Sequence, residues 1–487
     1  MNLLDRESPE FNAAADLQTQ SRAWTIAARG AWSDQRLQQR CAQILGTLFQ
    51  TPGTSFPQAF GTWANLKGFY RFMDNPRVGQ DQLRHMVEDD GLAACAGQEV
   101  VDGPADTTTI DLSRQRKNQQ AGPINDNPKS KGYFIHAALA FTGSGAPLGV
   151  VNLHVWTRPK TRRALTKRQE QLRPIAEKES FKWVRVMRQT SARLRALYGA
   201  RAPRQVYIFD CEGDIAEVFA EAGADPKLGF IIRAYHDRRV KSQQHQLKAT
   251  LKAQPPAGSW TITVPARPAR GKQPARPERQ AAVSIRFCSQ LNLAAHPRSV
   301  GGRRPRITVA AVAVIEDNPP PDLPPDDRVA WYLLTTEAVT TLEEAVRIVD
   351  RYALRWRCEE LHLTVKSGYL IEARQFAAVT RAAKSAILLV QAAFEILRLR
   401  RLSRTMPHRL AAEFFSPVEC QVLAHLAAAP VESPARLTVA AARQVIARLG
   451  GHLGRRRDGP AGVRTLWKGW RLVQLVVAYE LRRQESG

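Results

Sequence analysis

The 487 residues carry 71 Lys or Arg side chains against 45 Asp or Glu, a net charge of +26, and 44% of them are hydrophobic. A chain of this length is expected to form two or three domains, because one core rarely organises so many residues. The charge predicts a polyanionic partner, with nucleic acid as the first expectation and a membrane surface as the alternative. No apolar run reaches the roughly 18 residues of a membrane span, which argues against an integral membrane protein.

The start of the chain and its cysteines bear on the cellular compartment. The first residues, MNLLDRESPEFN, lack the basic and then apolar layout of a signal peptide. The six cysteines are scattered without a C-x-x-C pair, so neither a disulfide framework nor a zinc site is predicted, and they are interpreted as small core residues. We therefore expect a soluble protein that acts in the cytoplasm, with no membrane partner.

Residues 1–90 predict a small helical domain. In DQRLQQRCAQILGTLFQ, apolar side chains such as Leu37, Cys41 and Ile44 recur at helical spacing. A second helical pattern, GTWANLKGFYRFMDNP, ends at Pro76, which cannot continue a helix.

Residues 91–375 predict a mixed α/β (α+β) domain. The β-like runs GYFIHAALAF, LGVVNLHVW, RQVYIFD and LGFIIRAY are separated by turns and by a helical pattern around 176–199. Two Pro-rich segments and further strand-like runs indicate a β-rich insertion at about 240–330. Residues 376–487 are helical in pattern throughout, which predicts a C-terminal helical domain.

A basic segment runs from Arg158 to Arg204, with 15 Lys or Arg and 3 Glu. A solvated helix face normally mixes charges of both signs, so a phosphate-binding surface is an equally good interpretation. The sequence leaves both interpretations open.

The stretch YALRWRCEELHLTVK combines cations and carboxylates on one predicted helix. At 100° per residue, Tyr352, Arg355, Glu359 and Lys366 share a single stripe, opposite an apolar face. Arg355 and Glu359 are spaced for an ordinary surface ion pair worth a few tenths of a kcal/mol. From this helix alone, the surface pair is the favoured interpretation.

Two further carboxylates stand beside predicted strands. Asp106 lies in VVDGPADTTTIDLS, and Asp210 follows the apolar run RQVYIF. An Asp in such a place is often a turn former or a helix N-cap. Together with Glu359, however, they would supply the three hard oxygen ligands that a two-metal phosphoryl-transfer site requires.

These motifs together resemble the DDE transposases of the IS-four family, bacterial insertion-sequence enzymes whose YREK signature matches Y-x-x-R-x-x-x-E-x-x-x-x-x-x-K here. DTT at 106 and DCEGD at 210 match the first two acidic motifs, and FYRFMDNP, EKESFKW, WYLLTTE and LWKGW extend the likeness from about residue 30 to 475. The resemblance implies a ribonuclease-H-like core with a β-rich insertion. It also implies an N-terminal domain that binds transposon ends and a C-terminal domain that forms a homodimer.

The resemblance implies roles for individual residues. The catalytic and metal-binding triad would be Asp106, Asp210 and Glu359, which would hold two Mg²⁺ ions, with Mn²⁺ as a substitute. The residues implied to contact DNA are Tyr352, Arg355 and Lys366 at a phosphate, Trp331 at a flipped base, Arg233, and the end-recognition arginines Arg36, Arg40 and Arg71. The sequence departs from the pattern at Leu363, where the family relative carries a lysine, and the wedge residue has no secure match near Asp322 and Leu323.

The implied activity is cut-and-paste transposition of double-stranded DNA through a hairpin intermediate. Two alternatives are a DNA-binding regulator from a decayed element, which does not catalyse, and a ribonuclease-H-like nuclease that does not join strands. The intact carboxylates argue against the first alternative. The likenesses at both ends of the chain argue against the second.

Overall fold

The computed structural model describes most of the chain, namely residues 17–115, 121–160, 166–241, 246–269, 274–293, 307–376, 378–427, 433–455 and 458–486. Contacts divide the chain into two compact units, one formed by residues 1–94, 107–162 and 359–487 and the other by residues 95–106 and 163–358. Strand β1 and helix α11 each continue through this division. The three-domain boundaries drawn from the sequence stay a prediction.

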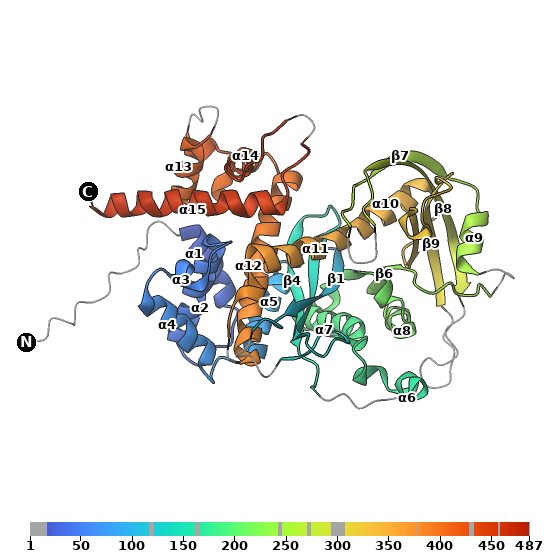
Figure 1. Cartoon of the computed structure of the whole chain (residues 1–487), viewed down its shortest axis with the longest axis horizontal. Helices are drawn as coiled ribbons and strands as arrows, with labels where there is room; N and C mark the ends of the chain where they lie inside the picture. Colours follow the sequence, from blue (N-terminus) through green and yellow to red (C-terminus); the bar gives the residue numbers. More distant parts are fainter. Residues whose placement is uncertain are drawn as a thin grey trace, which may run out of the picture. The chain divides into compact units, whose positions relative to one another are not determined.

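The first unit begins with five helices (Figure 1). Both predicted N-terminal helices are confirmed: α2 starts after Asp34, whose side chain accepts the N–H of Arg36 at 2.9 Å, and α4 starts after the capping residue Thr62. Their apolar stripes are buried. The helices are α1 (Leu17–Ala27), α2 (Gln35–Gln50), α3 (Phe56–Phe60), α4 (Trp63–Asp74) and α5 (Gln80–Ala93).

Helix α5 packs closely against strand β4 in the first unit. A Cβ atom on Gly91 would lie 2.3 Å from the carbonyl oxygen of Val150, and one on Gly149 would lie 2.2 Å from the Cα of Gly91. Only glycine at both positions lets the two backbones approach this closely. The strands of this unit are β2 (Gly122–Pro123), β3 (Lys131–Thr142) and β4 (Pro147–Trp156).

The end of the chain is helical, as predicted. Helix α12 is long and largely buried, and it contacts α2, α5 and β4. Its Glu395 binds Arg22 of α1, which also holds Asp90 of α5 through a pair of hydrogen bonds. Helix α15 packs against α13 and α14 (Figure 1). These helices are α12 (Val379–Thr405), α13 (Pro417–His425), α14 (Val439–Leu449) and α15 (Val463–Ser486).

The second unit contains most of the sheet. The described residues form one mixed sheet in the order β2-β3-β1-β5-β6-β10-β9-β8-β7, with β4 paired to β3. Strands β1, β5 and β6 are parallel, and the strands from β10 onward run antiparallel to their neighbours. The strands are β1 (Val100–Asp111), β5 (Arg204–Phe209), β6 (Leu228–Arg233), β7 (Gly258–Val264), β8 (Arg279–Leu293), β9 (Ile307–Glu316) and β10 (Ala330–Thr335).

Helices accompany the sheet of the second unit, so the mixed α/β class is confirmed. Helix α8 packs against β6, and α10 packs against β6, β8 and β9. The predicted insertion strands at about 240–330 are β7, β8 and β9. The helices are α6 (Lys167–Leu172), α7 (Phe181–Tyr198), α8 (Ala216–Ala224), α9 (Leu247–Ala253) and α10 (Leu342–Tyr352).

The single helix expected from Tyr352 to Lys366 is wrong in detail. Helix α10 ends at Tyr352, a 3₁₀ turn covers Ala353–Arg355, and α11 spans Trp356–Leu363. A π-helical turn, Thr364–Gly368, follows. The two changes of helical pitch alter the angles between side chains, so the stripe computed for a regular helix does not hold over its whole length.

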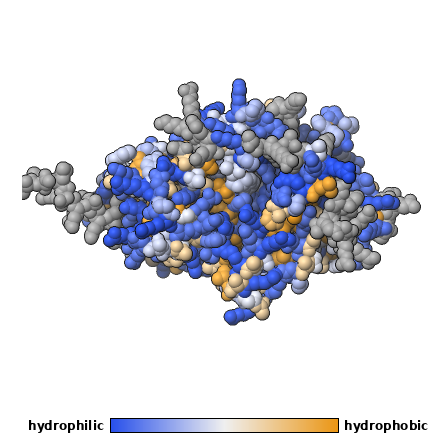
Figure 2. Space-filling model, turned by 90° about the horizontal axis from the view of Figure 1, so that it is seen from below, coloured by the Kyte–Doolittle hydropathy of each residue, from blue (hydrophilic) through white to orange (hydrophobic). Residues whose placement is uncertain are grey.

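No helix in the described part of the chain is long and apolar enough to cross a membrane. The face drawn in Figure 2 is covered mainly by hydrophilic residues, with apolar residues in smaller patches.

Candidate active site

Two of the predicted carboxylates belong to neighbouring parallel strands: Asp106 lies within β1, and Asp210 is the first residue after β5. Strand β1 pairs with β5 from Val100 opposite Arg204 to Pro104 opposite Ile208. Asp106 lies two residues beyond the last pair of this register on β1, and Asp210 lies two residues beyond it after β5. Residues two apart on a strand share a face, so the side chain of Asp106 is on the same face of β1 as that of Pro104. The two acids, 104 positions apart in the sequence, thus stand at the same end of paired strands, whereas the side chains that the described residues place close enough to share an ion with Asp106 are Glu359 and His362.

Asp210 is held by its own backbone. Its side chain accepts the N–H of Glu212 at 2.9 Å and caps the 3₁₀ turn Cys211–Gly213, as the N-cap interpretation expected. Burial raises the pKa of Asp210 and the charge of Glu212 adds to this, while the hydrogen bond from the Glu212 N–H and the charges of Arg355 and Lys182 act in the opposite direction. The neighbouring cations thus offset only part of the unfavourable effect of burial on the charged form of Asp210. Such a carboxylate is suited to binding a cation.

The last acid of the DCEGD motif has a structural role. Asp214 is buried and binds the guanidinium of Arg238, and its Oδ2 accepts the N–H groups of Tyr235 and His236 at 2.8 and 2.9 Å. These bonds hold the segment that follows β6. The structure thus separates a structural Asp214 from the half-buried Asp210.

Arg355 contacts the first acid. Its Nη1 donates to Oδ2 of Asp106 at 3.0 Å, and its guanidinium lies 5.5 Å from the ring centre of Trp356. The sequence-based expectation was that this arginine would face DNA phosphate. Here its cation binds one member of the predicted triad, and it also lowers the pKa of Asp210, so it acts electrostatically on two predicted ligands.

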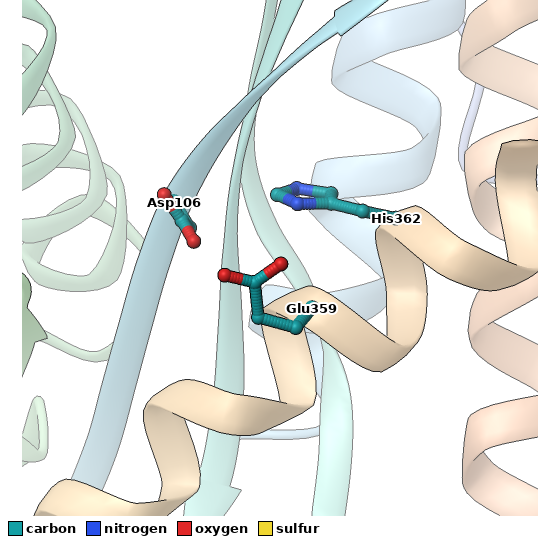
Figure 3. Close-up of side chains that lie close together, drawn as sticks. All are labelled: Asp106, Glu359 and His362. Carbon is teal, nitrogen blue, oxygen red and sulfur yellow. The ribbon is translucent and has the colours of Figure 1, made fainter. Parts of the chain in front are cut away.

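Glu359 lies one turn beyond Arg355, on helix α11. Figure 3 shows its carboxylate and the imidazole of His362 directed toward Asp106 of β1. One ligand atom from each of these three side chains lies within 4.8 Å of the other two. His362 was missed from the sequence, although the spacing E-x-x-H, which places both residues on one side of a helix, was an available signal.

A buried ion-pair network holds the elements behind these residues. Arg351, the residue before Tyr352, donates to Oδ1 of Asp102 from Nε at 3.0 Å and from Nη2 at 2.5 Å. Its Nη1 binds Glu337 at 2.8 Å, and Glu337 also binds Arg204. Because Asp102 is on β1 and Arg351 is on α10, the network fixes the end of α10 against the strand that carries Asp106.

Two predicted DNA-contacting aromatic residues touch each other. Trp331 is half-buried on β10 and lies edge-on to Tyr352, with ring centres 5.9 Å apart. Tyr352 is buried, which raises its pKa to about 12, while Arg355 and Arg233 act in the opposite direction. Arg233 is exposed at the end of β6 and donates to the carbonyl oxygen of Ala330 at 3.4 Å. These residues belong to the same unit as Asp106 and Asp210.

Lys366 lies in the π-helical turn and is half-buried. Its Nζ is 3.7 Å from Oε1 of Glu372, which also accepts the N–H of Asp111 at 3.1 Å. Leu363, the position at which the family pattern has a lysine, ends α11 and is half-buried.

The N-terminal arginines occupy two helices of the first unit. Arg36 is exposed and Arg40 is half-buried on α2, and Arg71 is exposed in the last turn of α4. Arg40 reaches α4, because a Cβ atom on Gly68 would lie 3.2 Å from its Nη1. Arg40 and Arg71 are therefore associated with the same helix.

Several cations of the basic segment are paired. On α7 and just before it, Lys182 binds Glu212 at 2.7 Å, Arg188 binds Glu221 at 2.5 Å, and Arg195 binds Asp225. These three cations are thus partly neutralised by acidic side chains, and the choice between a solvated helix face and a phosphate-binding surface stays open for the segment. Residues 161–165 of the segment lie outside the described residues.

Two families match parts of the chain. The family described as transposase DNA-binding matches residues 29–78, and the family described as transposase Tn5 dimerisation domain matches residues 391–485. Together they support a DNA transposase of the Tn5-like class, with a DNA-binding segment in α2 to α4 and a dimerisation segment in α12 to α15.

A solved structure described as a piggyBac transposase synaptic complex with hairpin DNA is similar at 10% sequence identity, over 82% of this chain and 70% of that chain. Its TM-score of 0.35 is too low to carry an argument about the fold or the activity.

Proposed function

We propose that this protein is a cut-and-paste DNA transposase of the DDE type, carrying the YREK signature of the IS-four family on a ribonuclease-H-like catalytic region. The observation that carries the proposal is the arrangement of the acids. Asp106 on β1 and Asp210 directly after β5 lie at the same end of paired parallel strands, and a carboxylate oxygen of Glu359 comes within 4.8 Å of one of Asp106. Three acids from separate parts of the chain are a costly arrangement that a purely structural role does not need.

The triad fits a divalent cation. Carboxylate oxygens are the ligands that Mg²⁺ and Mn²⁺ prefer, whereas the imidazole of His362 is a nitrogen donor that Mg²⁺ seldom accepts. We therefore assign one or two Mg²⁺ ions, with Mn²⁺ as a substitute, to Asp106, Asp210 and Glu359. When bound, such ions activate an attacking oxygen and stabilise the leaving oxygen of a phosphodiester.

The cations around the triad would position the DNA. Arg355 and Arg233 both lower the pKa of Tyr352, and Arg355 also lowers that of Asp210. We propose that these two arginines, together with Lys366, bind phosphate oxygens of the DNA. Binding phosphate would require Arg355 to turn from Asp106 and Lys366 to turn from Glu372. Tyr352 would support Trp331, whose partly exposed ring would stack on a base that has left the duplex.

The proposed reaction runs in four displacements at phosphorus. Water first cleaves one strand at each transposon end and leaves a 3′-hydroxyl. That hydroxyl attacks the opposite strand and forms a hairpin, and a second water opens the hairpin. The free 3′ ends then attack target DNA. One set of ligands can serve all four steps, because only the attacking oxygen differs between them.

The two ends of the chain would supply DNA binding and pairing of subunits. The DNA-binding match at residues 29–78 supports contact with the inverted-repeat ends, and the dimerisation match supports a homodimer. On α15, Leu472, Leu475 and Tyr479 recur at helical spacing and are exposed by 43 to 65%. Such an apolar stripe suits burial against a second copy of the chain.

The test is an assay of the purified protein with Mg²⁺ on DNA that carries the inverted repeats flanking its gene. We expect cleavage at the ends and joining of 3′ ends to a target plasmid. Binding without cleavage would support a regulator that does not catalyse. Cleavage without joining would support a nuclease, and full activity without a divalent ion would contradict the proposed triad.

A further inference from the structure

Helix α11 exposes a tryptophan beside the candidate site. Trp356 is the first residue of the helix and is 60% exposed. The buried side of the helix is formed by Cys358 and Leu361, which lie at about 200° and 140° from Trp356 at 100° per residue. Single exposed apolar residues are common on protein surfaces, so the exposure of Trp356 by itself indicates no function. Its neighbours do.

Trp356 shares one side of α11 with Glu359. The two residues are three positions apart, or about 60° around the helix axis, and both are exposed. Leu363, the position at which the family relative carries a lysine, lies at about 20° from Trp356 on the same side and is half-buried. Glu359 therefore has an apolar side chain one turn before it and another one turn after it.

The ring of Trp356 also contacts a cation of the candidate site. The guanidinium of Arg355 lies 5.5 Å from the ring centre, within the range of a cation–π interaction. The same guanidinium donates to Oδ2 of Asp106 at 3.0 Å. Trp356 is thus joined to the proposed metal ligands in two ways, through Arg355 to Asp106 and through the helix to Glu359.

Trp356 differs from Trp331, the other tryptophan of this region. Trp331 is on β10, is half-buried and lies edge-on to Tyr352. Trp356 is on α11, is more exposed and follows Arg355 directly in the chain. The two rings come from different elements and have different neighbours. They are therefore suited to contact different nucleotides.

A nucleotide matches the chemistry of Arg355 and Trp356. It combines a charged phosphate with a base whose flat face is apolar, and guanidinium and indole groups are suited to these two parts. Every base has such a face, so stacking tolerates any sequence. Leucine in place of lysine at position 363 favours contact with a base or a deoxyribose over contact with a phosphate.

We propose that Trp356 is a positioning residue that stacks on the base next to the phosphate that is cleaved, while Arg355 binds that phosphate. This inference rests on the proposed function, because it takes phosphodiester cleavage at Asp106, Asp210 and Glu359 as its setting. Stacking would hold the phosphate in line with the attacking oxygen, and alignment of this kind contributes to the rate of the chemical step. Trp356 thus acts on the cleavage rate and not on the choice of DNA sequence.

The test combines changes in the protein with a change in the DNA. One duplex carries the inverted repeat that flanks the gene, and a second duplex lacks only the base next to the cleaved phosphate. Single-turnover cleavage at saturating protein is measured for the full-length parent, Trp356→Ala and Trp356→Phe. Trp260→Ala, which removes a tryptophan that is 39% exposed on β7, is the control and should cleave both duplexes as the parent does. Circular dichroism confirms that each variant is folded.

Trp356→Ala is expected to lower the cleavage rate of the complete duplex by about 10-fold, with little change in the protein concentration that gives half-saturation. On the duplex without the base it should have no further effect, because there is no base on which the ring can stack. Trp356→Phe, which keeps a flat ring, should retain most of the rate. Equal losses on the two duplexes, or no loss on either, would overturn the inference.

A second readout needs no cleavage. The base next to the cleaved phosphate is replaced by 2-aminopurine, whose fluorescence is quenched when it stacks on an indole ring, and complexes are formed without divalent ions. The complex with Trp356→Ala should be brighter than the complex with the parent. Equal brightness would overturn this inference alone. A parent that binds the duplex but does not cleave it in Mg²⁺ would count against the proposed function, while the fluorescence would still test Trp356.

Discussion

Strand β1 carries two acid–arginine pairs that look alike and differ in their surroundings. Asp102 binds Arg351 and Asp106 binds Arg355, so each acid is four residues from the other on the strand and each arginine is four residues from the other on the chain. Asp102 is completely buried, and Glu337 and Arg204 enclose its partner. Asp106 accepts a 3.0 Å bond from Arg355, which stands next to the exposed Trp356 in the chain.

The same four-residue spacing thus places one acid–arginine pair in the protein interior and the other at the candidate site. We call Asp102–Arg351 the inner pair and Asp106–Arg355 the outer pair. Residues four apart share a face of a strand, so Asp102 and Asp106 lie on the same face of β1, and the inner pair helps to position the outer pair.

In the inner pair, Arg351 also binds Glu337, which in turn binds Arg204. These additional ion pairs make the inner pair a structural anchor. In the outer pair, one ligand atom of Asp106 lies within 4.8 Å of one from Glu359 and one from His362, so this pair stands beside further groups that could hold a cation. We expect substitutions in the two pairs to affect different properties.

The largest effect on stability is expected from Arg351→Met. The change leaves Asp102 and Glu337 buried without their shared cation, and breaking a buried pair in this way costs about 3–5 kcal/mol. Urea denaturation followed by circular dichroism measures the loss. The control is Arg347→Met on the same helix, whose 3.7 Å pair with Glu344 is exposed and is worth less than about 1 kcal/mol. Equal effects of the two changes would contradict an anchoring role for Arg351.

Arg355→Met is expected to show the reverse pattern. Stability should fall by less than in Arg351→Met, because the side chain of Asp106 keeps 12% exposure to solvent, whereas that of Asp102 has none. The rate of first-strand cleavage should fall by about 100-fold, as is typical when one electrostatic donor is lost from a site of charge development. Single-turnover cleavage of end DNA with saturating protein measures this rate. Unchanged cleavage would remove Arg355 from the proposed site.

A smaller effect is expected from Glu337→Gln, and it depends on pH. Burial alone would raise the pKa of Glu337, but Arg204 and Arg351 hold it below its ordinary value of 4.5. A carboxylate with a lowered pKa stabilises the fold above its ordinary pKa, and this stabilisation is lost as the pH falls through the lowered value. Melting temperatures between pH 3 and pH 7 should therefore fall less steeply below pH 4.5 in the variant than in the parent. Parallel curves would show that Glu337 does not contribute in this way.

The smallest expected effect is that Asp210→Asn raises the melting temperature of the protein slightly at pH 7 without divalent ions. The pKa of Asp210 is raised by burial, so its ionised form costs stability above its ordinary pKa. Asparagine removes the charge and can still accept the N–H of Glu212. Differential scanning fluorimetry in the presence of a chelator measures the change. A lower melting temperature would mean that the carboxylate is compensated more fully than its burial indicates.

The sequence predicted the elements better than the contacts between them. The runs that became β3, β5 and β6 were recognisable because buried parallel and central strands are nearly continuous in apolar residues. Asp106 and Asp210 were selected because each stands beside such a strand. The pairing of Asp102 with Arg351 could not be found in this way, because it joins residues 249 positions apart.

The spacing of apolar residues also could not predict the local structure of the candidate site. The pattern of apolar residues around Glu359 fits a regular helix, and nothing in it marks the 3₁₀ turn before Trp356 or the π-helical turn after Leu363. His362 escaped notice because a single histidine on a helix is usually a core or surface residue. Trp356 escaped notice because a tryptophan in a helix is usually part of the core.

The most direct test of the central claim is single-turnover cleavage of end DNA by Asp106→Asn, Asp210→Asn, Glu359→Gln and the three double variants, in Mg²⁺ and in Mn²⁺. If the three carboxylates act as one unit, each single change should lower the rate by about 1,000-fold or more, and a second change should lower it little further. Binding of the end duplex should persist in every variant. A cleavage rate within tenfold of the parent's for any single variant would contradict the assignment of that carboxylate to the site.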